Sequence, residues 1–137
     1  MANRHISEEH DRLLTEVELE LMTVIWSLEK ATVKEVISHM SKDRSLAYTT
    51  VATVMKILEQ KGFLTCHKDS HAHTFSPAVS KKSYESTCLD HVVTNVFDGE
   101  PVALVQRLLD VRKLSKSEIE AIKKSLQKLS ASEKGRK

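Results

Sequence analysis

Six cysteine and histidine side chains have spacings that could hold a metal ion. Thiolate sulfur and imidazole nitrogen are preferred zinc ligands, and a structural zinc site usually needs four of them at about 2.0–2.3 Å. Cys88 and His91 would share one face of a helix, but no second compact pair accompanies them. The candidates are Cys66, His67, His71, His73, Cys88 and His91. Because these spacings match no recognised metal-site pattern, we predict no cofactor.

The two cysteines could also support redox chemistry. Cys66 and Cys88 are far apart in the sequence, and in a reducing compartment we expect free thiols rather than a disulfide. Cys88 occupies an apolar position, where most free cysteines act as small hydrophobic residues. If Cys88 lay close to its equivalent in a second copy of the chain, its oxidation could change the interface between the copies.

A third kind of chemistry, contact with the edges of DNA bases, is indicated by the segment from Ala47 to Cys66. Its apolar residues repeat with helical spacing and form one stripe, made of Val51, Val54, Met55 and Leu58. The opposite side carries small or polar side chains, namely Thr49, Ala52, Thr53, Lys56 and Gln60. A B-DNA major groove about 12 Å wide admits one helix, and hydroxyl, methyl and ammonium groups can contact base edges and phosphates there. We therefore interpret the segment as a DNA recognition helix that leads into a β-strand.

Two shorter helices precede this segment, and each begins with a capping box, Thr15 with Glu18 and Thr32 with Glu35. The three predicted helices cover residues 16–29, 33–41 and 47–62. After Gly62 the apolar period changes to two over residues 63–68 and 71–76, which predicts two strands around a tight turn. Three helices followed by such a hairpin are typical of a winged helix-turn-helix with a two-stranded wing. We predict a mainly α (α+β) fold in which residues 1–80 form a winged-helix DNA-binding domain.

Residues 81–137 are predicted to form a helical dimerisation region with a frayed basic tail from residue 130 onward. Apolar side chains recur with helical spacing over residues 80–99, again after Pro101, and again after a capping box of Ser115 and Glu118. No further segment remains to cover these stripes, so a second copy of the chain is the simplest partner. The residues that we expect at this interface are Cys88, Leu89, Val92, Val96, Val105, Leu108, Leu109, Ile119, Ile122 and Leu126.

Composition limits the other possible functions. The chain has 137 residues, 40% of them hydrophobic and 29% charged, with only three glycines and two prolines, which fits one small helix-rich protein. It carries no glycine-rich phosphate loop and no nucleophile elbow, so we predict no enzymatic activity. The charged N-terminal segment does not resemble a signal peptide, and no apolar run is long enough to span a membrane. We therefore expect a cytoplasmic protein with no membrane partner.

Charge is unevenly distributed, although the net charge is only +2. Residues 1–80 carry nine Lys or Arg and eleven Asp or Glu, whereas residues 42–68 carry five cations and two anions. Positive charge therefore gathers around the proposed recognition helix and hairpin, which favours contact with phosphate.

Several motifs resemble a known family. The most specific segments are LTEVELELMTVIW, SLAYTTVATVMKILEQKGFL, KDSHAHTFSPAVS and LSKSEIEAIKKSL. Their order and spacing across residues 13–129 resemble the penicillinase-repressor family of winged-helix regulators, the BlaI/MecI/CopY type. The resemblance implies a homodimeric transcriptional repressor that binds a pseudo-palindromic operator in double-stranded DNA and leaves it on a signal. It also implies that the DNA contacts come from Tyr48, Thr49, Thr50, Ala52, Thr53, Lys56, Lys68 and His71.

Three features depart from members of that family. Ala52 stands where some relatives carry a long cation, so it offers only a methyl group, and the operator sequence should differ from theirs. Some relatives are released by cleavage at an Asn-Phe bond, but the aligned residues here are Arg107 and Leu108, so that rule does not transfer. The copper-responsive branch has paired cysteines at its C-terminus, whereas the tail KLSASEKGRK has none.

Two alternatives remain open from the sequence. The first keeps DNA binding and adds metal or redox sensing through Cys66, Cys88 and the nearby histidines. The second is a protein-interaction module in which the winged helix binds a partner protein, and it predicts no salt-dependent binding to duplex DNA.

Overall fold

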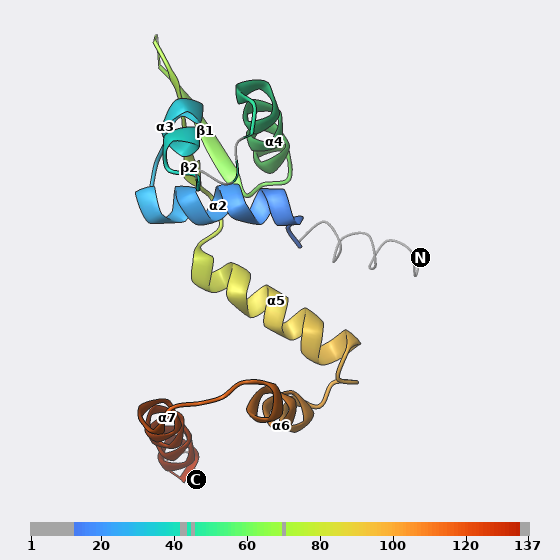
Figure 1. The fold of residues 1–137 in the computed structure, drawn as a ribbon. Helices are drawn as coiled ribbons and strands as arrows, with labels where there is room; N and C mark the ends of the chain where they lie inside the picture. The colour runs from blue at the N-terminus through green and yellow to red at the C-terminus, as the bar shows by residue number, and fades with distance from the viewer. Residues whose placement is uncertain (1–12, 42–43, 45, 70, 135–137) are drawn as a thin grey trace. The chain divides into compact units, whose positions relative to one another are not determined.

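The computed structural model of the protein describes residues 13–41, 44, 46–69 and 71–134 (Figure 1). In chain order the elements are α2 (Glu16–Leu28), α3 (Val33–Ser38), α4 (Tyr48–Gln60), β1 (Leu64–Lys68), β2 (His73–Pro77), α5 (Lys81–Asn95), α6 (Pro101–Val111) and α7 (Lys116–Lys134). The predicted class, a mainly α winged helix with a two-stranded wing, is confirmed. The chain divides into two compact units, one ending at Val92 and the other beginning at Val93. Among the described residues, no helix has the length and apolar character needed to cross a membrane.

The first two helices begin at the predicted capping boxes. The Thr15 backbone N–H donates to Glu18 Oε1 at 2.8 Å, and Thr15 Oγ1 accepts from the Glu18 N–H at 3.2 Å. Thr32 and Glu35 make the same reciprocal pair at 3.1 and 3.2 Å. These bonds satisfy N–H groups that a helix start leaves unpaired. Helix α3 ends at Ser38 rather than near residue 41, and the His39 N–H donates to the Glu35 carbonyl oxygen at 3.2 Å at this end.

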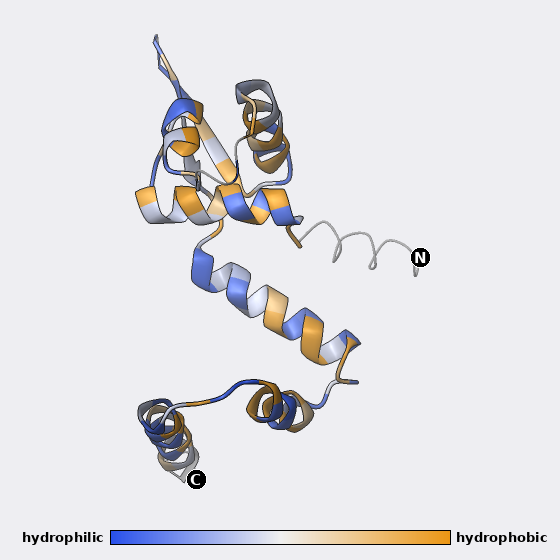
Figure 2. Ribbon diagram, in the orientation of Figure 1, coloured by the Kyte–Doolittle hydropathy of each residue, from blue (hydrophilic) through white to orange (hydrophobic). Residues whose placement is uncertain are grey.

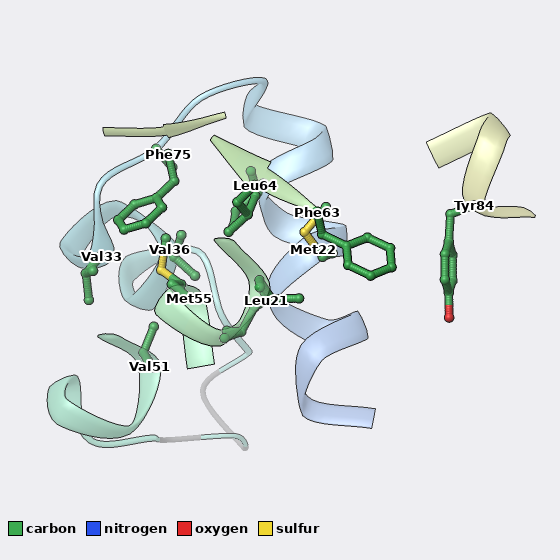
Figure 3. Close-up of a cluster of buried hydrophobic side chains, with 13 residues drawn as sticks. Leu21, Met22, Val33, Val36, Val51, Met55, Phe63, Leu64, Phe75 and Tyr84 are labelled. Atoms are coloured by element: carbon green, nitrogen blue, oxygen red, sulfur yellow. The ribbon is translucent and has the colours of Figure 1, made fainter. Parts of the chain in front are cut away.

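The core of the first unit lies where α2, α3 and α4 meet (Figure 3). Its fully buried large side chains are Leu21, Met22 and Ile25 of α2, Val36 of α3, and Val51, Met55 and Leu58 of α4. The predicted apolar stripe of α4 therefore faces the core, with Val54 half buried at its edge. Burial of each such side chain stabilises the fold by about 1.5–3 kcal/mol. Helix α4 is held by one face, which leaves its other face available.

The hairpin pairs β1 and β2 in antiparallel register, with Cys66 opposite Phe75 and Lys68 opposite His73. Beyond the paired Lys68 and His73, the Asp69 N–H donates to the carbonyl oxygen of Ala72 at 3.2 Å, which continues the pairing toward the turn. The predicted strand over residues 71–76 is wrong at its start, since β2 begins at His73.

A β-bridge between Ala31 and Phe75, which the sequence did not predict, helps to attach the hairpin to the helices. Ala31, between α2 and α3, bonds to Phe75 in both directions, at 2.9 Å from its N–H and 2.8 Å to its carbonyl oxygen. A bridge that involves one residue on each side creates no repeating pattern in the sequence, so the sequence could not predict it. The bridge fixes the base of the wing beside the helical core.

Aromatic side chains join the first half of α5 to the same core. The Tyr84 ring lies 5.8 Å from the Trp26 ring and 5.9 Å from the Phe63 ring, measured between centroids. The Tyr84 hydroxyl accepts from the Leu14 N–H at 2.8 Å, and the Trp26 indole N–H donates to the Val79 carbonyl oxygen at 2.9 Å. The start of α5 is therefore part of the first compact unit, and the functional boundary between residues 80 and 81 stays a prediction.

The second unit contains α6 and α7, and Figure 2 shows apolar residues recurring along both helices. The capping box of Ser115 and Glu118 forms as predicted, with bonds of 3.0 and 3.2 Å. The prediction of fraying from residue 130 is wrong as far as Lys134, because α7 continues to that residue. The first strong helix breaker in the tail is Gly135, which explains the extra turn. Residues 135–137 lie outside the described residues.

Candidate nucleic-acid interface

The face of α4 opposite the buried stripe consists of exposed side chains. Thr49, Thr53 and Lys56 are exposed, as the sequence predicted, and so is Thr50. Tyr48, the first residue of α4, has 52% of its surface exposed despite its large ring. This face offers hydroxyl groups, one ammonium group and one aromatic ring to a partner.

Ala52 differs from its neighbours on this face because it is half buried and packs against the edge of the core. Its side chain lines a groove between α4 and the hairpin, so part of its methyl group remains accessible. A methyl group at this place can contact another apolar group, such as the methyl of thymine.

The groove between α4, the hairpin and the start of α3, which we call the wing groove, has a volume of about 630 Å³. Its lining residues are Thr32, Val33, Lys34, Tyr48, Ala52, Lys56, Glu59, Cys66, Lys68, His71, Ala72, His73 and Phe75. Three lysines line it against a single carboxylate, so the wing groove is positively charged. A groove of that sign attracts polyanions such as a nucleic-acid backbone. Five of the predicted contact residues come together here, namely Tyr48, Ala52, Lys56, Lys68 and His71.

Lys34 and His73 belong to this surface, although the sequence did not predict them as DNA contacts. Lys34 lies in α3, outside the segment that the helix pattern singled out, and only the fold brings it to the wing groove. His73 was considered only as a metal ligand, although its pairing with Lys68 places both in this lining. Within residues 42–68, cations outnumber anions. That imbalance could have prompted a search for further cations that the fold brings close to this segment, such as Lys34.

Two ion pairs hold α4 in position. Lys61, which caps the C-terminal end of α4, donates to both carboxylate oxygens of Glu18, at 3.2 and 3.0 Å. Before α4, Arg44 Nε donates to Glu20 Oε2 at 3.0 Å. Burial alone would raise the pKa of Glu18, but the Thr15 N–H and the Lys61 ammonium lower it below the ordinary value of 4.5. The Glu18 carboxylate is therefore stabilised in its charged form and fixes the end of the recognition helix to α2.

The metal-ligand candidates do not form a cluster. Within residues 13–41, 44, 46–69 and 71–134, no three His, Cys, Asp or Glu side chains gather as the ligands of a metal ion would. Cys66 and His67 are neighbours on one strand and therefore point to opposite faces of the hairpin. The geometry gives no support to a metal site in the wing.

The surroundings of the Cys66 thiol do not favour redox sensing. Burial raises the pKa of the Cys66 thiol above its ordinary value of 9.0, and the carboxylate of Glu59 raises it further. Because the thiolate is the reactive form, a raised pKa lowers reactivity. Cys88 is half buried and lines an apolar hollow of about 420 Å³ between α2 and α5. Burial raises the pKa of the neighbouring Tyr84 to about 12, and the Cys88 thiol adds to that rise.

An exposed polar helix face beside a positively charged groove and a β-hairpin, on a helix-turn-helix core, defines a winged-helix DNA-binding protein. The chain belongs to the penicillinase repressor family, whose sequence profile matches residues 14–128. It is a DNA-binding transcriptional repressor.

Individual relatives differ considerably in sequence from this chain. The penicillinase repressor of Bacillus licheniformis is 27% identical over 106 residues, which cover 77% of this chain and 83% of that protein. The transcriptional regulator BlaI of Mycobacterium tuberculosis is 29% identical over 121 residues, which cover 86% of each chain. The solution structure of monomeric Bacillus licheniformis BlaI in complex with the blaP half-operator is 30% identical, covers 53% of this chain and 88% of that one, and has a TM-score of 0.45.

Proposed function

We propose that this repressor acts in the cytoplasm as a homodimer on a pseudo-palindromic operator, with α4 of each copy in a major groove. The observation that carries the proposal is the two-sided character of α4. Val51, Met55 and Leu58 are buried in the core, whereas Thr49 and Thr53 are exposed on the other side. A helix that is anchored by one face and presents short polar side chains on the other fits the width of the major groove.

The contacts divide into two kinds by the chemistry of the side chains. Contacts with base edges are assigned to Thr49, Thr50, Ala52 and Thr53, which are short enough to let the helix approach the bases. Contacts with phosphates are assigned to Tyr48, Lys56, Lys68 and His71, which line the wing groove. Phosphate contacts should provide most of the affinity and nearly all of its salt dependence.

The homodimer is supported by the apolar side chains that a single chain leaves exposed. Among the ten predicted interface residues, Leu89, Val96, Val105, Leu108, Leu109, Ile119, Ile122 and Leu126 are exposed, while Cys88 and Val92 are half buried. Soluble proteins seldom leave that many large apolar side chains in water, because burying each one is favourable. A two-fold dimer would also present two recognition helices to two inverted half-sites.

The test is selection of binding sites from a library of random duplexes by the purified full-length chain. We expect one enriched motif made of two inverted half-sites. Lys56→Glu should reduce affinity for that motif by at least about tenfold at moderate salt, because it replaces a phosphate contact by a repulsive charge. Lys124→Glu, which changes an exposed lysine of α7, is the matched control and should leave affinity within about twofold.

The same measurement separates the repressor from a protein-interaction module. Absence of salt-dependent duplex binding by the wild-type chain would contradict the proposal and favour the interaction module. An enriched motif with a single half-site, unaffected by protein concentration, would contradict the homodimer while keeping DNA binding.

A further inference from the structure

The three exposed threonines of α4 differ in how their hydroxyl groups are engaged. The Thr53 hydroxyl donates its proton to the backbone carbonyl oxygen of Thr49 at 2.7 Å. The hydroxyls of Thr49 and Thr50 make no hydrogen bond with any residue that the structure describes. Thr49 and Thr50 can therefore both donate and accept, whereas the proton of Thr53 is already committed.

The consequence for Thr53 follows from the chemistry of a hydroxyl group. A threonine hydroxyl has one proton and two lone pairs, so a hydroxyl that already donates can only accept from a further partner. Bonding to the carbonyl one turn earlier is a common arrangement of threonine in a helix. Since Thr53 is exposed, its oxygen and methyl group remain accessible on the recognition face.

The edges of the bases differ in what they offer to such a group. In the major groove, adenine presents the N6 amino group and cytosine the N4 amino group, both of which donate. Guanine presents only the acceptors N7 and O6, and thymine presents the acceptor O4 with a methyl group. An oxygen that can only accept is therefore matched by adenine or cytosine and opposed by guanine.

Resting on the proposed function, in which α4 lies in the major groove, we infer that Thr53 recognises the exocyclic amino group of adenine or cytosine and discriminates against guanine. Lys56, three residues further along the same face, has the opposite chemistry because an ammonium group only donates. The recognition face of α4 thus presents an acceptor at Thr53 and a donor at Lys56. Because Lys56 is assigned to a phosphate, Thr53 is the one of the two that reads a base edge, and no guanine of the half-site should lie opposite it.

The first experiment compares the site preferences of four full-length proteins by selection from random duplexes. Thr53→Val removes the hydroxyl but keeps the shape, Thr53→Ser keeps the hydroxyl, and Thr49→Val is the matched control on the same face. Wild type and Thr53→Ser should prefer adenine or cytosine over guanine at one position of each half-site. Thr53→Val should lose about threefold to tenfold of that preference, the effect of one hydrogen bond. Thr49→Val should leave that position unchanged.

The second experiment removes the amino group from the DNA. In the selected site, the preferred adenine is replaced by purine, or the preferred cytosine by 2-pyrimidinone, and both duplexes are titrated with wild type and with Thr53→Val. Removing the amino group should reduce the affinity of both proteins, and the factor of reduction should be about threefold to tenfold larger for the wild type than for Thr53→Val. Because both proteins meet the same weakened base pair, its effect cancels in this double-mutant cycle.

Three results would overturn the inference while leaving the repressor intact. The first is that Thr53→Val selects the same motif as the wild type. The second is a preference for guanine that depends on the Thr53 hydroxyl. The third is that removing the amino group weakens binding by the same factor for the wild type and for Thr53→Val. If the wild type selects no motif at all, the proposed function fails and this inference fails with it. The first experiment therefore separates the two failures.

Discussion

The two compact units of this protein treat their apolar residues in opposite ways. In the first unit, Leu21, Met55 and the other large core residues are completely buried. In the second unit, α6 has no buried residue, and Val105, Leu108 and Leu109 keep 45–50% of their surface exposed. The first unit therefore builds its own core, whereas the second has apolar surface that its own helices do not cover.

Local helix signals do not account for this difference. Capping boxes begin α2 in the first unit and α7 in the second, with hydrogen bonds of nearly the same length. Helices of this length draw most of their stability from packing of an apolar face rather than from propensity. The exposed apolar surface of the second unit supports its proposed dimerisation, and the predictions below test that proposal.

The largest effect should come from a cavity in the first unit. Met55→Ala removes a fully buried side chain of α4 and should lower the free energy of unfolding by about 2–5 kcal/mol. Leu126→Ala, at a position with 61% exposure in α7, is the comparison variant. Urea unfolding at two protein concentrations should show a loss for Met55→Ala at both. For Leu126→Ala the loss should be largest where the wild type is dimeric and should shrink as the protein is diluted, because its contribution depends on dimerisation. If both variants lost the same unfolding free energy at both concentrations, the proposed difference between the two units would be contradicted.

The next effect tests the second unit directly. Val105→Asp with Leu109→Asp places two charges on the exposed apolar face of α6, and desolvating them in an interface is unfavourable. We expect monomers in analytical ultracentrifugation and a loss of about 100-fold in affinity for a two-half-site duplex, because the second half-site no longer contributes. Gln106→Asp, on an exposed polar position of the same helix, is the control. A double variant that remains dimeric would remove α6 from the interface.

The sequence predicted those features that repeat along a short segment. The stripe that begins at Val51 has the helical period, and the capping boxes of Thr15 and Thr32 have a fixed spacing of three, so each is visible without the fold. The hairpin was found in the same way from its period of two. The exposed face that contains Thr53 followed as the complement of the stripe.

The features that the sequence did not predict depend on contacts between distant residues. Ala31 pairs with Phe75, and Tyr84 contacts Leu14 and Trp26, although no spacing links these positions along the chain. Lys34 reaches the wing groove for the same reason. Such contacts come from tertiary packing, which local patterns do not encode.

A smaller effect should distinguish two capping carboxylates, one in each unit. Glu18→Gln can keep the capping bond to Thr15 but loses the ion pair with Lys61, so it should cost about 1–2 kcal/mol of stability at neutral pH. Glu118→Gln, in a capping box that is fully exposed, should have a smaller effect. Urea unfolding of both variants at pH 7 measures the difference.

The effect of Glu18→Gln should also depend on pH, with a definite sign. The pKa of Glu18 is lowered in the folded protein, so its carboxylate stabilises the fold above the ordinary value of 4.5. That contribution is lost as the pH falls through the lowered pKa. The gap in unfolding free energy between wild type and variant should therefore shrink below about pH 4.5. A gap that stays constant down to about pH 3 would mean that Glu18 acts through packing rather than charge.

The smallest effect concerns a single phosphate contact, and it compares one lysine of the first unit with one lysine of the second. Lys56→Ala, in the wing groove, should weaken operator binding several-fold and reduce the slope of log affinity against log salt by about one. Lys124→Ala removes an exposed lysine of the second unit and should leave the slope unchanged. Both lysines carry the same charge, so a general electrostatic attraction would change both slopes equally. A change in the slope for Lys56→Ala only would instead assign the salt dependence to the wing groove, because only an ammonium close to phosphate releases a condensed counterion.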